Sequence, residues 1–105
     1  MKGRLILMLA ISIAGTAIAS PLTPQSRQEL MNSMVPSCIK AQTENPANAN
    51  VPAGLIKKFC NCMANETANN MTQEQADYIE ATNDPSPMIK ATVKAQQICV
   101  QQVFG

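Results

Sequence analysis

The sequence predicts an all-α protein of four to five short helices, joined into a disulfide-stapled bundle. Strand signals are nearly absent: the chain has one Tyr, two Phe and no Trp, and no run alternates convincingly with β-branched residues. Helix caps and apolar residues at helical spacing, by contrast, recur along the chain. Four cysteines complete the pattern, because an even number in a small chain is typical of a crosslinked fold.

Residues 1–19 have the organisation of a secretory signal. Lys2 and Arg4 precede a short apolar stretch, and an A-x-A site ends at Ala19. We predict cleavage after Ala19, which leaves residues 20–105 as a single helical domain. No second apolar stretch of about 20 residues follows, so we expect no integral membrane anchor and a periplasmic or secreted location in bacteria.

The charge of the processed chain is close to neutral. Removing Lys2 and Arg4 lowers the basic residues from 8 to 6, against 7 acidic residues, which gives a net charge of −1. Nucleic acids and anionic membranes are bound through clustered cations, so we expect neither as a partner. Nine Gln and nine Asn in residues 20–105 provide a surface that forms hydrogen bonds without charge.

The first helix is predicted to begin at Thr23-Pro24, since Thr is a good N-cap and Pro suits the first helical position. Pro36 lacks an N–H and clashes with the preceding turn, so we expect it to kink or divide this helix near Val35. Residues 45–50 form a linker by composition. The apolar residues of the first helix recur at helical spacing: Leu30, Met31, Met34, Val35, Cys38 and Ile39.

Three more helices follow the linker. The second is predicted from near Pro52 to near Asn69. The third begins at the capping-box pattern Thr72-Gln73-Glu74-Gln75 and ends near Asn83. The last begins at Ser86-Pro87, with Ser as the N-cap. The apolar face of the second helix contains Leu55, Ile56, Phe59 and Met63, and that of the last contains Ile89, Val93, Val100 and Val103, with Cys99 beside them.

The cysteines Cys38, Cys60, Cys62 and Cys99 all follow the predicted cleavage site and are expected to form two disulfides. A Cys60–Cys62 bridge is disfavoured, because residues two apart on a helix differ by about 200° in direction. On a helical wheel these two residues flank the apolar face, so each can reach a different neighbouring helix. We prefer Cys38 with Cys60 and Cys62 with Cys99, from the heights of the residues on antiparallel helices; the pairing of Cys38 with Cys62 and Cys60 with Cys99 remains open.

Other chemistries of these residues are less favoured. Cys60, Cys62 and the adjacent Met63 offer soft ligands for Cu(I), and a Cys-x-Cys pair beside lysines is a candidate redox dithiol. The chain has no His, however, and the pair lies inside a predicted helix. A period-three series of carboxylates, Glu74, Asp77 and Glu80, is interpreted as a solvated helix face. We therefore expect no enzyme, no cofactor and no metal site.

One family resemblance is carried by Phe59-Cys60-Asn61-Cys62, the helix start at Thr72-Gln73-Glu74-Gln75, and Cys99, together with the signal peptide. With these features the chain resembles the small four-cysteine, all-helical periplasmic proteins of Gram-negative bacteria, most of which have no assigned function. The resemblance spans most of residues 20–105, and it implies an exported helical protein without naming any site residue. Plant lipid-transfer proteins are more distantly similar, because a Cys-x-Cys there also joins two helices, but they have eight cysteines.

From these observations we expect a non-enzymatic protein of the bacterial envelope, inhibitor- or immunity-like, whose partner is another protein. Its binding surface is expected to be an amide-rich helical face. The alternative is a carrier of a small hydrophobic ligand, because four crosslinked helices rich in Met, Ile, Leu and Val could enclose a cavity.

Overall fold

The computed structural model describes residues 20–105, and the predicted signal peptide, residues 1–19, lies outside the described residues. The described chain forms no strand, only an isolated bridge between Pro21 and Thr72. The all-α fold class is therefore confirmed. Its elements are α2 (Pro24–Glu44), the short 3₁₀ turn η1 (Pro46–Asn48), α3 (Ala53–Asn69), α4 (Gln73–Thr82) and α5 (Ser86–Phe104).

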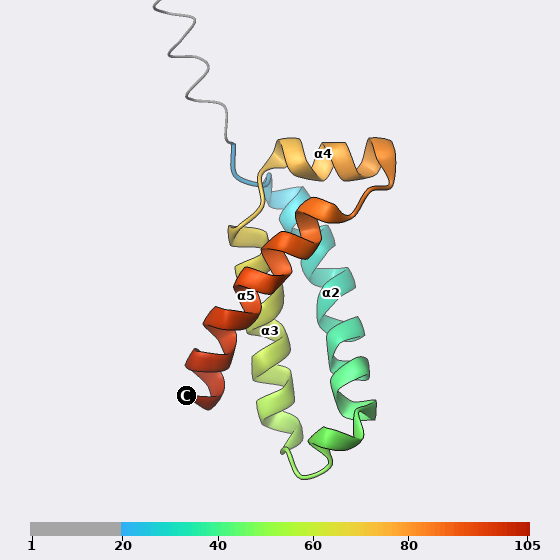
Figure 1. Ribbon diagram of the computed structural model, residues 1–105. Helices are drawn as coiled ribbons and strands as arrows, with labels where there is room; N and C mark the ends of the chain where they lie inside the picture. Colours follow the sequence, from blue (N-terminus) through green and yellow to red (C-terminus); the bar gives the residue numbers. More distant parts are fainter. Residues whose placement is uncertain (1–19) are drawn as a thin grey trace, which may run out of the picture.

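The helix α3 is the centre of the arrangement. It packs against both α2 and α5, whereas α2 and α5 do not pack closely against each other. The helices α2 and α3 form an antiparallel hairpin with η1 at its turn, and α5 crosses α3 (Figure 1). The short helix α4 lies across the end of the hairpin where α2 begins and α3 ends (Figure 1).

Two of the predicted helix starts are formed by the expected caps. Thr23 Oγ1 accepts a hydrogen bond from the backbone N–H of Ser26 at 3.1 Å, with Pro24 in the first turn of α2. At the start of α4, Thr72 Oγ1 accepts from the N–H of Gln75 at 3.1 Å, and the N–H of Thr72 donates to Gln75 Oε1 at 2.9 Å. This reciprocal pair is a complete capping box.

Two details of the predicted helices differ in the structure. Of the two outcomes expected at Pro36, a kink or a division of the helix, the division does not occur, because α2 is continuous through it. Pro36 and Asn32, whose carbonyl loses its helical partner, are both exposed, so water can satisfy that carbonyl. Ser86 is the first residue of α5 rather than its N-cap, and Asp84 Oδ1 accepts from its N–H at 3.0 Å.

The core of the described residues is small and lies mainly on α3 and α5. Its buried apolar residues are Ile56, Cys60, Met63, Ala64, Ala68, Met71, Ala91, Ala95 and Cys99. The helix α2 has no fully buried residue. It therefore contributes to the core only through side chains such as Met34, which packs against the cluster of Met63, Ala95 and Cys99.

The prediction of which face of α5 is buried is wrong, because the helix is rotated about its axis relative to that prediction. Ile89 is 57% exposed and Val93 is 53% exposed, whereas Ala91 and Ala95 are buried. Residues two apart on a helix point about 160° apart, so these are nearly opposite faces. The buried alanines and Cys99 are spaced four residues apart, and their small side chains permit a close approach of α5 to the core.

One buried polar atom has no partner among the described residues. Thr67 on α3 is fully buried, and its Oγ1 forms no hydrogen bond. Thr67→Val keeps the shape and helix propensity of the side chain, so removing this hydroxyl should raise the free energy of unfolding by about 1 kcal/mol. Thr67→Ser, which retains the hydroxyl and loses the methyl group, should lower it. Urea unfolding of both variants checks the prediction, and a destabilised Thr67→Val would contradict it.

Candidate functional site

The four cysteines form the two preferred disulfides. Cys38 of α2 is bonded to Cys60 of α3, and Cys62 of α3 is bonded to Cys99 of α5, with Cα–Cα distances of 5.6 and 5.8 Å. The preferred pairing is confirmed, and the two cysteines of the Cys-x-Cys pair leave α3 towards different neighbours, as expected from their directions on the helix. The helix α3 is thus covalently attached to both helices that pack against it.

All four cysteine sulfur atoms are oxidised, because each belongs to a disulfide. None of the four cysteines is free, so no thiolate is available to bind Cu(I) or to act as a redox nucleophile in this form. No group of three His, Cys, Asp or Glu side chains gathers at metal-binding distance within residues 20–105. Two disulfides are typical of proteins in an oxidising, extracellular environment.

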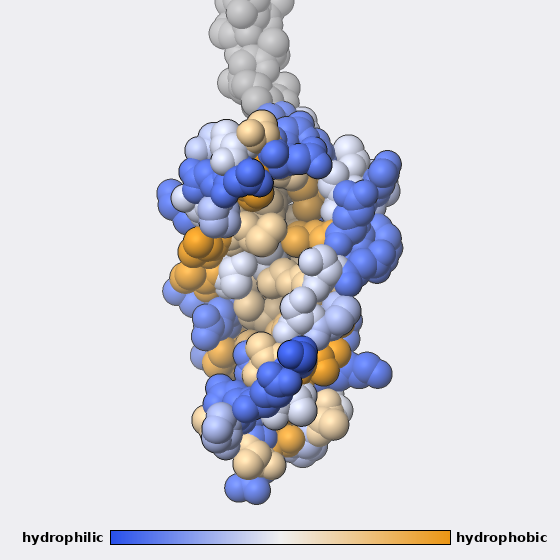
Figure 2. All heavy atoms as spheres, turned by 90° about the vertical axis from the view of Figure 1, so that its right-hand side faces the viewer, coloured by the Kyte–Doolittle hydropathy of each residue, from blue (hydrophilic) through white to orange (hydrophobic). Residues whose placement is uncertain are grey.

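A set of large apolar side chains on α5 faces solvent instead of the core. They lie on one side of the helix as two pairs separated by the exposed Gln96 and Gln97, and we call them the apolar band: Ile89, Val93, Val100 and Phe104. Phe104 is held near α3 by a ring contact with Phe59, whose centroid lies 5.6 Å away. Figure 2 shows a different face, the one that lies to the right in Figure 1 on the side of α2, where apolar surface lies between hydrophilic margins.

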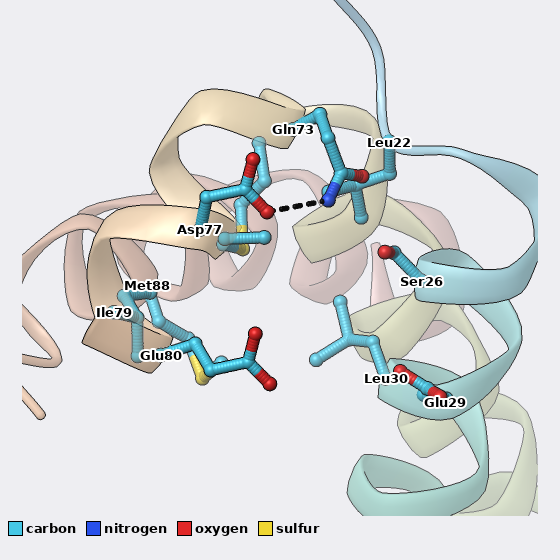
Figure 3. A pocket seen from close by; sticks show the side chains of 11 residues that line it. Leu22, Ser26, Glu29, Leu30, Gln73, Asp77, Ile79, Glu80 and Met88 are labelled. Atoms are coloured by element: carbon cyan, nitrogen blue, oxygen red, sulfur yellow. Dashed lines mark hydrogen bonds between the residues drawn. The ribbon is translucent and has the colours of Figure 1, made fainter.

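A pocket of about 210 Å³ opens where α2, α4 and the start of α5 meet. Three carboxylates line it, Glu29 from α2 and Asp77 and Glu80 from α4, and we call it the acidic pocket. Figure 3 shows Asp77 and Glu80 projecting from α4 into the space that faces Leu30 of α2. Its apolar lining consists of Leu22, Leu30, Met71, Ala76, Ile79 and Met88.

No cation of the described residues neutralises the acidic pocket. The only ion pair within residues 20–105 joins Lys40 to Glu44 on α2. In the pocket, Asp77 accepts a hydrogen bond from Gln73 at 3.0 Å, and Glu29 accepts one from Gln25 at 3.5 Å. These are neutral donors, so the pocket combines an apolar lining with three uncompensated negative charges.

A second polar cluster occupies the turn between α4 and α5. Asp84 accepts hydrogen bonds from the hydroxyl of Ser86 at 2.6 Å and from that of Tyr78 at 2.7 Å. These two bonds, the first being the stronger, hold the pKa of Asp84 below its ordinary value, and the same carboxylate raises the pKa of Tyr78. With Asn83 in the left-handed conformation at the end of α4, the cluster fixes the direction in which α5 leaves the turn.

The volumes of the surface pockets can be compared with the volume that a carrier of a small hydrophobic ligand needs. A ligand site of that kind usually has at least about 300 Å³, mostly enclosed. The acidic pocket is smaller, and a hollow of about 90 Å³ beside Phe59 and Phe104 is smaller still. Two depressions of about 310 and 340 Å³, beside Ile39 and beside Pro36, are shallow and open. Among residues 20–105, none of these hollows is both enclosed and as large as such a site.

Sequence reasoning found only parts of this site. Asp77 and Glu80 were expected on a solvated face, and they are exposed, but their meeting with Glu29 depends on how α4 crosses α2. The residues of the apolar band, except Phe104, were expected to be buried. The exposure of the band could have been predicted from the second, small-residue face of α5, because Ala91 and Ala95 lie on the same side of the helix as Cys99.

Comparison of the chain with family models, curated proteins and solved structures finds no match. Within residues 20–105, no helix has both the length and the apolar character needed to span a membrane.

Proposed function

We propose that the chain is a small, exported, non-enzymatic protein of the bacterial envelope that binds another protein, in the manner of an inhibitor or an immunity protein. The apolar band carries this proposal. Four large apolar side chains, from Ile89 at 57% exposed to Val100 at 41%, face solvent along one helix. Exposed large apolar side chains gathered on one side of a helix often mark a site of interaction, because leaving them in water is unfavourable.

The scaffold beneath the band supports the same proposal. The band lies on α5, which the Cys62–Cys99 disulfide fixes to α3. A rigid surface loses little conformational entropy on binding, so more of the interaction energy becomes affinity. Small inhibitors gain affinity in this way. The absence of His from the sequence makes acid–base and nucleophilic catalysis harder to build, which also favours binding over chemistry.

Export is supported by the position of Ser20, the residue after the predicted cleavage point. Its N–H donates to Glu74 Oε1 at 3.4 Å, its hydroxyl donates to Glu74 Oε2 at 3.3 Å, and its carbonyl accepts from the N–H of Gln73. Hydrolysis after Ala19 turns this N–H into an α-ammonium beside the carboxylate. The new terminus then forms an ion pair at the start of α4, so the processed chain begins at a residue that is already held in the fold.

The proposal can be tested by crosslinking in the native cell. The full chain, with its own residues 1–19, is expressed with a photo-reactive amino acid at Ile89 or, as the control, at Gln101 of the same helix. We expect a discrete adduct from position 89 in the periplasmic fraction and little from position 101. Val93→Glu should remove the adduct, because it places a charge in the band, whereas Gln101→Glu should not.

Both positions are exposed, so neither substitution should unfold the protein, and circular dichroism of the purified variants verifies this. Equal labelling from the two positions would contradict the proposal. Recovery of the chain only from the cytosol, or an adduct that persists in Val93→Glu, would also contradict it.

A further inference from the structure

We infer that removal of residues 1–19 strengthens the attachment of α4: the α-ammonium that cleavage leaves on Ser20 pairs with Glu74 and holds the start of this helix against the start of α2. The inference rests on the cleavage after Ala19 that the proposed function includes, and it adds a conformational consequence of that cleavage. Three properties of the described residues support it: the weak attachment of α4 elsewhere, the contacts of residues 20–23, and the charge of Glu74.

The helix α4 is the least secured of the four helices in residues 20–105. Both disulfides join the long helices α2, α3 and α5, whereas α4 contains no cysteine and no fully buried residue. Its last turn is held at the connection to α5, where Tyr78 donates a hydrogen bond to Asp84 at 2.7 Å. Its first turn follows the buried Met71 and lies beside residues 20–23, which precede α2 (Figure 1).

Residues 20–23 are hydrogen-bonded to the first residue of α4. The carbonyl of Ser20 accepts from the backbone N–H of Gln73 at 2.9 Å, and the N–H of Thr23 donates to Gln73 Oε1 at 3.0 Å. Thr23 is also the N-cap of α2. The same short segment therefore connects the starts of α2 and α4, and a change at its first residue acts directly on the position of α4.

Cleavage changes the charge of this first residue. Water adds across the Ala19–Ser20 peptide bond, Ala19 leaves as a carboxylate, and the amine of Ser20 takes up a proton because its ordinary pKa is about 8. Ser20 N lies 3.4 Å from Glu74 Oε1, which is within the range of an ion pair. The pKa of Glu74 is lowered, chiefly by a hydrogen bond from its own N–H and further by those from Ser20, so the carboxylate is charged at neutral pH.

The place of the pair on α4 makes Glu74 necessary after cleavage. The start of a helix is the positive end of its dipole, which favours a carboxylate and disfavours an ammonium. Glu74, in the first turn of α4, compensates both the dipole and the new charge. Without it, the processed chain would hold a positive charge against the positive end of the helix. Loss of Glu74 should therefore weaken α4 more in the processed chain than in a chain with a neutral terminus.

The inference can be tested by hydrogen exchange of the processed protein. The chain is exported, purified from the periplasm with its disulfides intact, and weighed by mass spectrometry to establish that it begins at Ser20. Part of it is acetylated at the α-amine near pH 6.5, where the lysines are protonated and unreactive. We expect acetylation to accelerate exchange of the amides 77–82 by about two- to fivefold, the range for an exposed ion pair, and to leave the amides of α3 unchanged.

Matched variants assign the effect to the pair. Glu74→Gln should accelerate exchange in α4 by a larger factor in the processed chain than in the acetylated chain, and the ratio of the two factors isolates the interaction. Glu80→Gln removes a carboxylate from the other end of the same helix, and its effect should be equal in both forms. The rate at which the α-amine reacts with an acylating reagent is a second measurement, since pairing keeps the amine protonated. It should rise at least about twofold in Glu74→Gln and stay unchanged in Glu80→Gln.

The outcomes separate this inference from the proposed function. A periplasmic chain that begins at another residue would overturn both the predicted cleavage and the inference. If the chain begins at Ser20 but acetylation leaves exchange in α4 unchanged, or Glu74→Gln has the same effect in both forms, the inference alone is overturned and the proposed function stands. If Glu74→Gln unfolds α4 in both forms, the α-amine of the native sequence decides: slower acylation than in urea supports the pair, and an equal rate overturns it.

Discussion

Replacing Cys62 and Cys99 together with alanine is expected to lower the free energy of unfolding by about 4 kcal/mol. This bridge joins residues 37 apart in the sequence, and the constraint that a disulfide places on the unfolded chain increases with the length of the closed loop. The net stability of a single small domain is only about 5–15 kcal/mol. The double variant should therefore be partly or fully unfolded at 37 °C.

The matched comparison is the double variant of Cys38 and Cys60, whose bridge spans 22 residues and should contribute about 3 kcal/mol. The helix α2 also has contacts to α3 that survive this change. Arg27 donates to the side-chain oxygens of Asn65 and Asn69 on α3, at 2.6 and 2.7 Å. Within residues 20–105, no comparable hydrogen bond joins α5 to α3: Cys62 Sγ lies 3.6 Å from Gln102 Oε1, but a disulfide sulfur has no hydrogen to donate.

Urea unfolding followed by circular dichroism of both double variants, and of the reduced native sequence, measures these contributions. We expect the Cys62/Cys99 variant to be less stable than the Cys38/Cys60 variant, and the reduced protein to be less stable than either. An equal loss for the two bridges, or the reverse order, would show that α5 is held by its packing rather than by its disulfide.

The local chemistry of the chain made most of the helix boundaries predictable. Thr23-Pro24 and the capping box at Thr72 satisfy backbone N–H groups within a few residues, so their effect does not depend on the rest of the fold. The exclusion of a Cys60–Cys62 bridge was predictable for a similar reason, because both residues are on one regular helix and their directions follow from helix geometry alone. The choice between the two remaining pairings depended instead on the heights of the residues on neighbouring helices.

The rotation of α5 could not be predicted from apolar periodicity. The helix has two faces that both qualify as apolar, one with Ile89 and Val93 and one with Ala91 and Ala95. The usual assignment buries the larger side chains, since they release more surface from water. Here the Cys62–Cys99 bridge fixes the small-residue face against α3, so covalent attachment outweighs the larger gain from burying isoleucine and valine.

The candidate site was unpredictable for a different reason. Glu29 and Glu80 are 51 residues apart in the sequence and belong to helices with no shared pattern. They meet because the chain turns at Asn83 and because Ser20 and Thr23 attach the start of α2 to the start of α4. Such a convergence is a product of the tertiary fold, and single-helix patterns contain no information about it.

Met63→Ala is expected to lower the free energy of unfolding by about 3–5 kcal/mol, in the upper part of the range for such truncations. Met63 is 7% exposed and lies in the cluster with Ala95 and Cys99 of α5, against which Met34 of α2 packs. It is thus a large, buried side chain in a cluster to which all three long helices contribute. Removing most of it leaves a space that neighbouring groups must fill.

The disulfides make that space difficult to fill. A cavity costs less free energy when the surrounding helices can move together to fill it. Here the two bridges start from Cys60 and Cys62, which lie on either side of Met63 around the axis of α3, and they hold α2 and α5 at fixed distances from α3. Met63→Leu, which keeps the volume, should cost less than about 1.5 kcal/mol, and Met31→Ala on α2 should also cost little because Met31 is only half-buried. A loss below about 1 kcal/mol for Met63→Ala would mean that the helices can collapse despite their crosslinks, and the rigidity on which the binding surface depends would then be wrong.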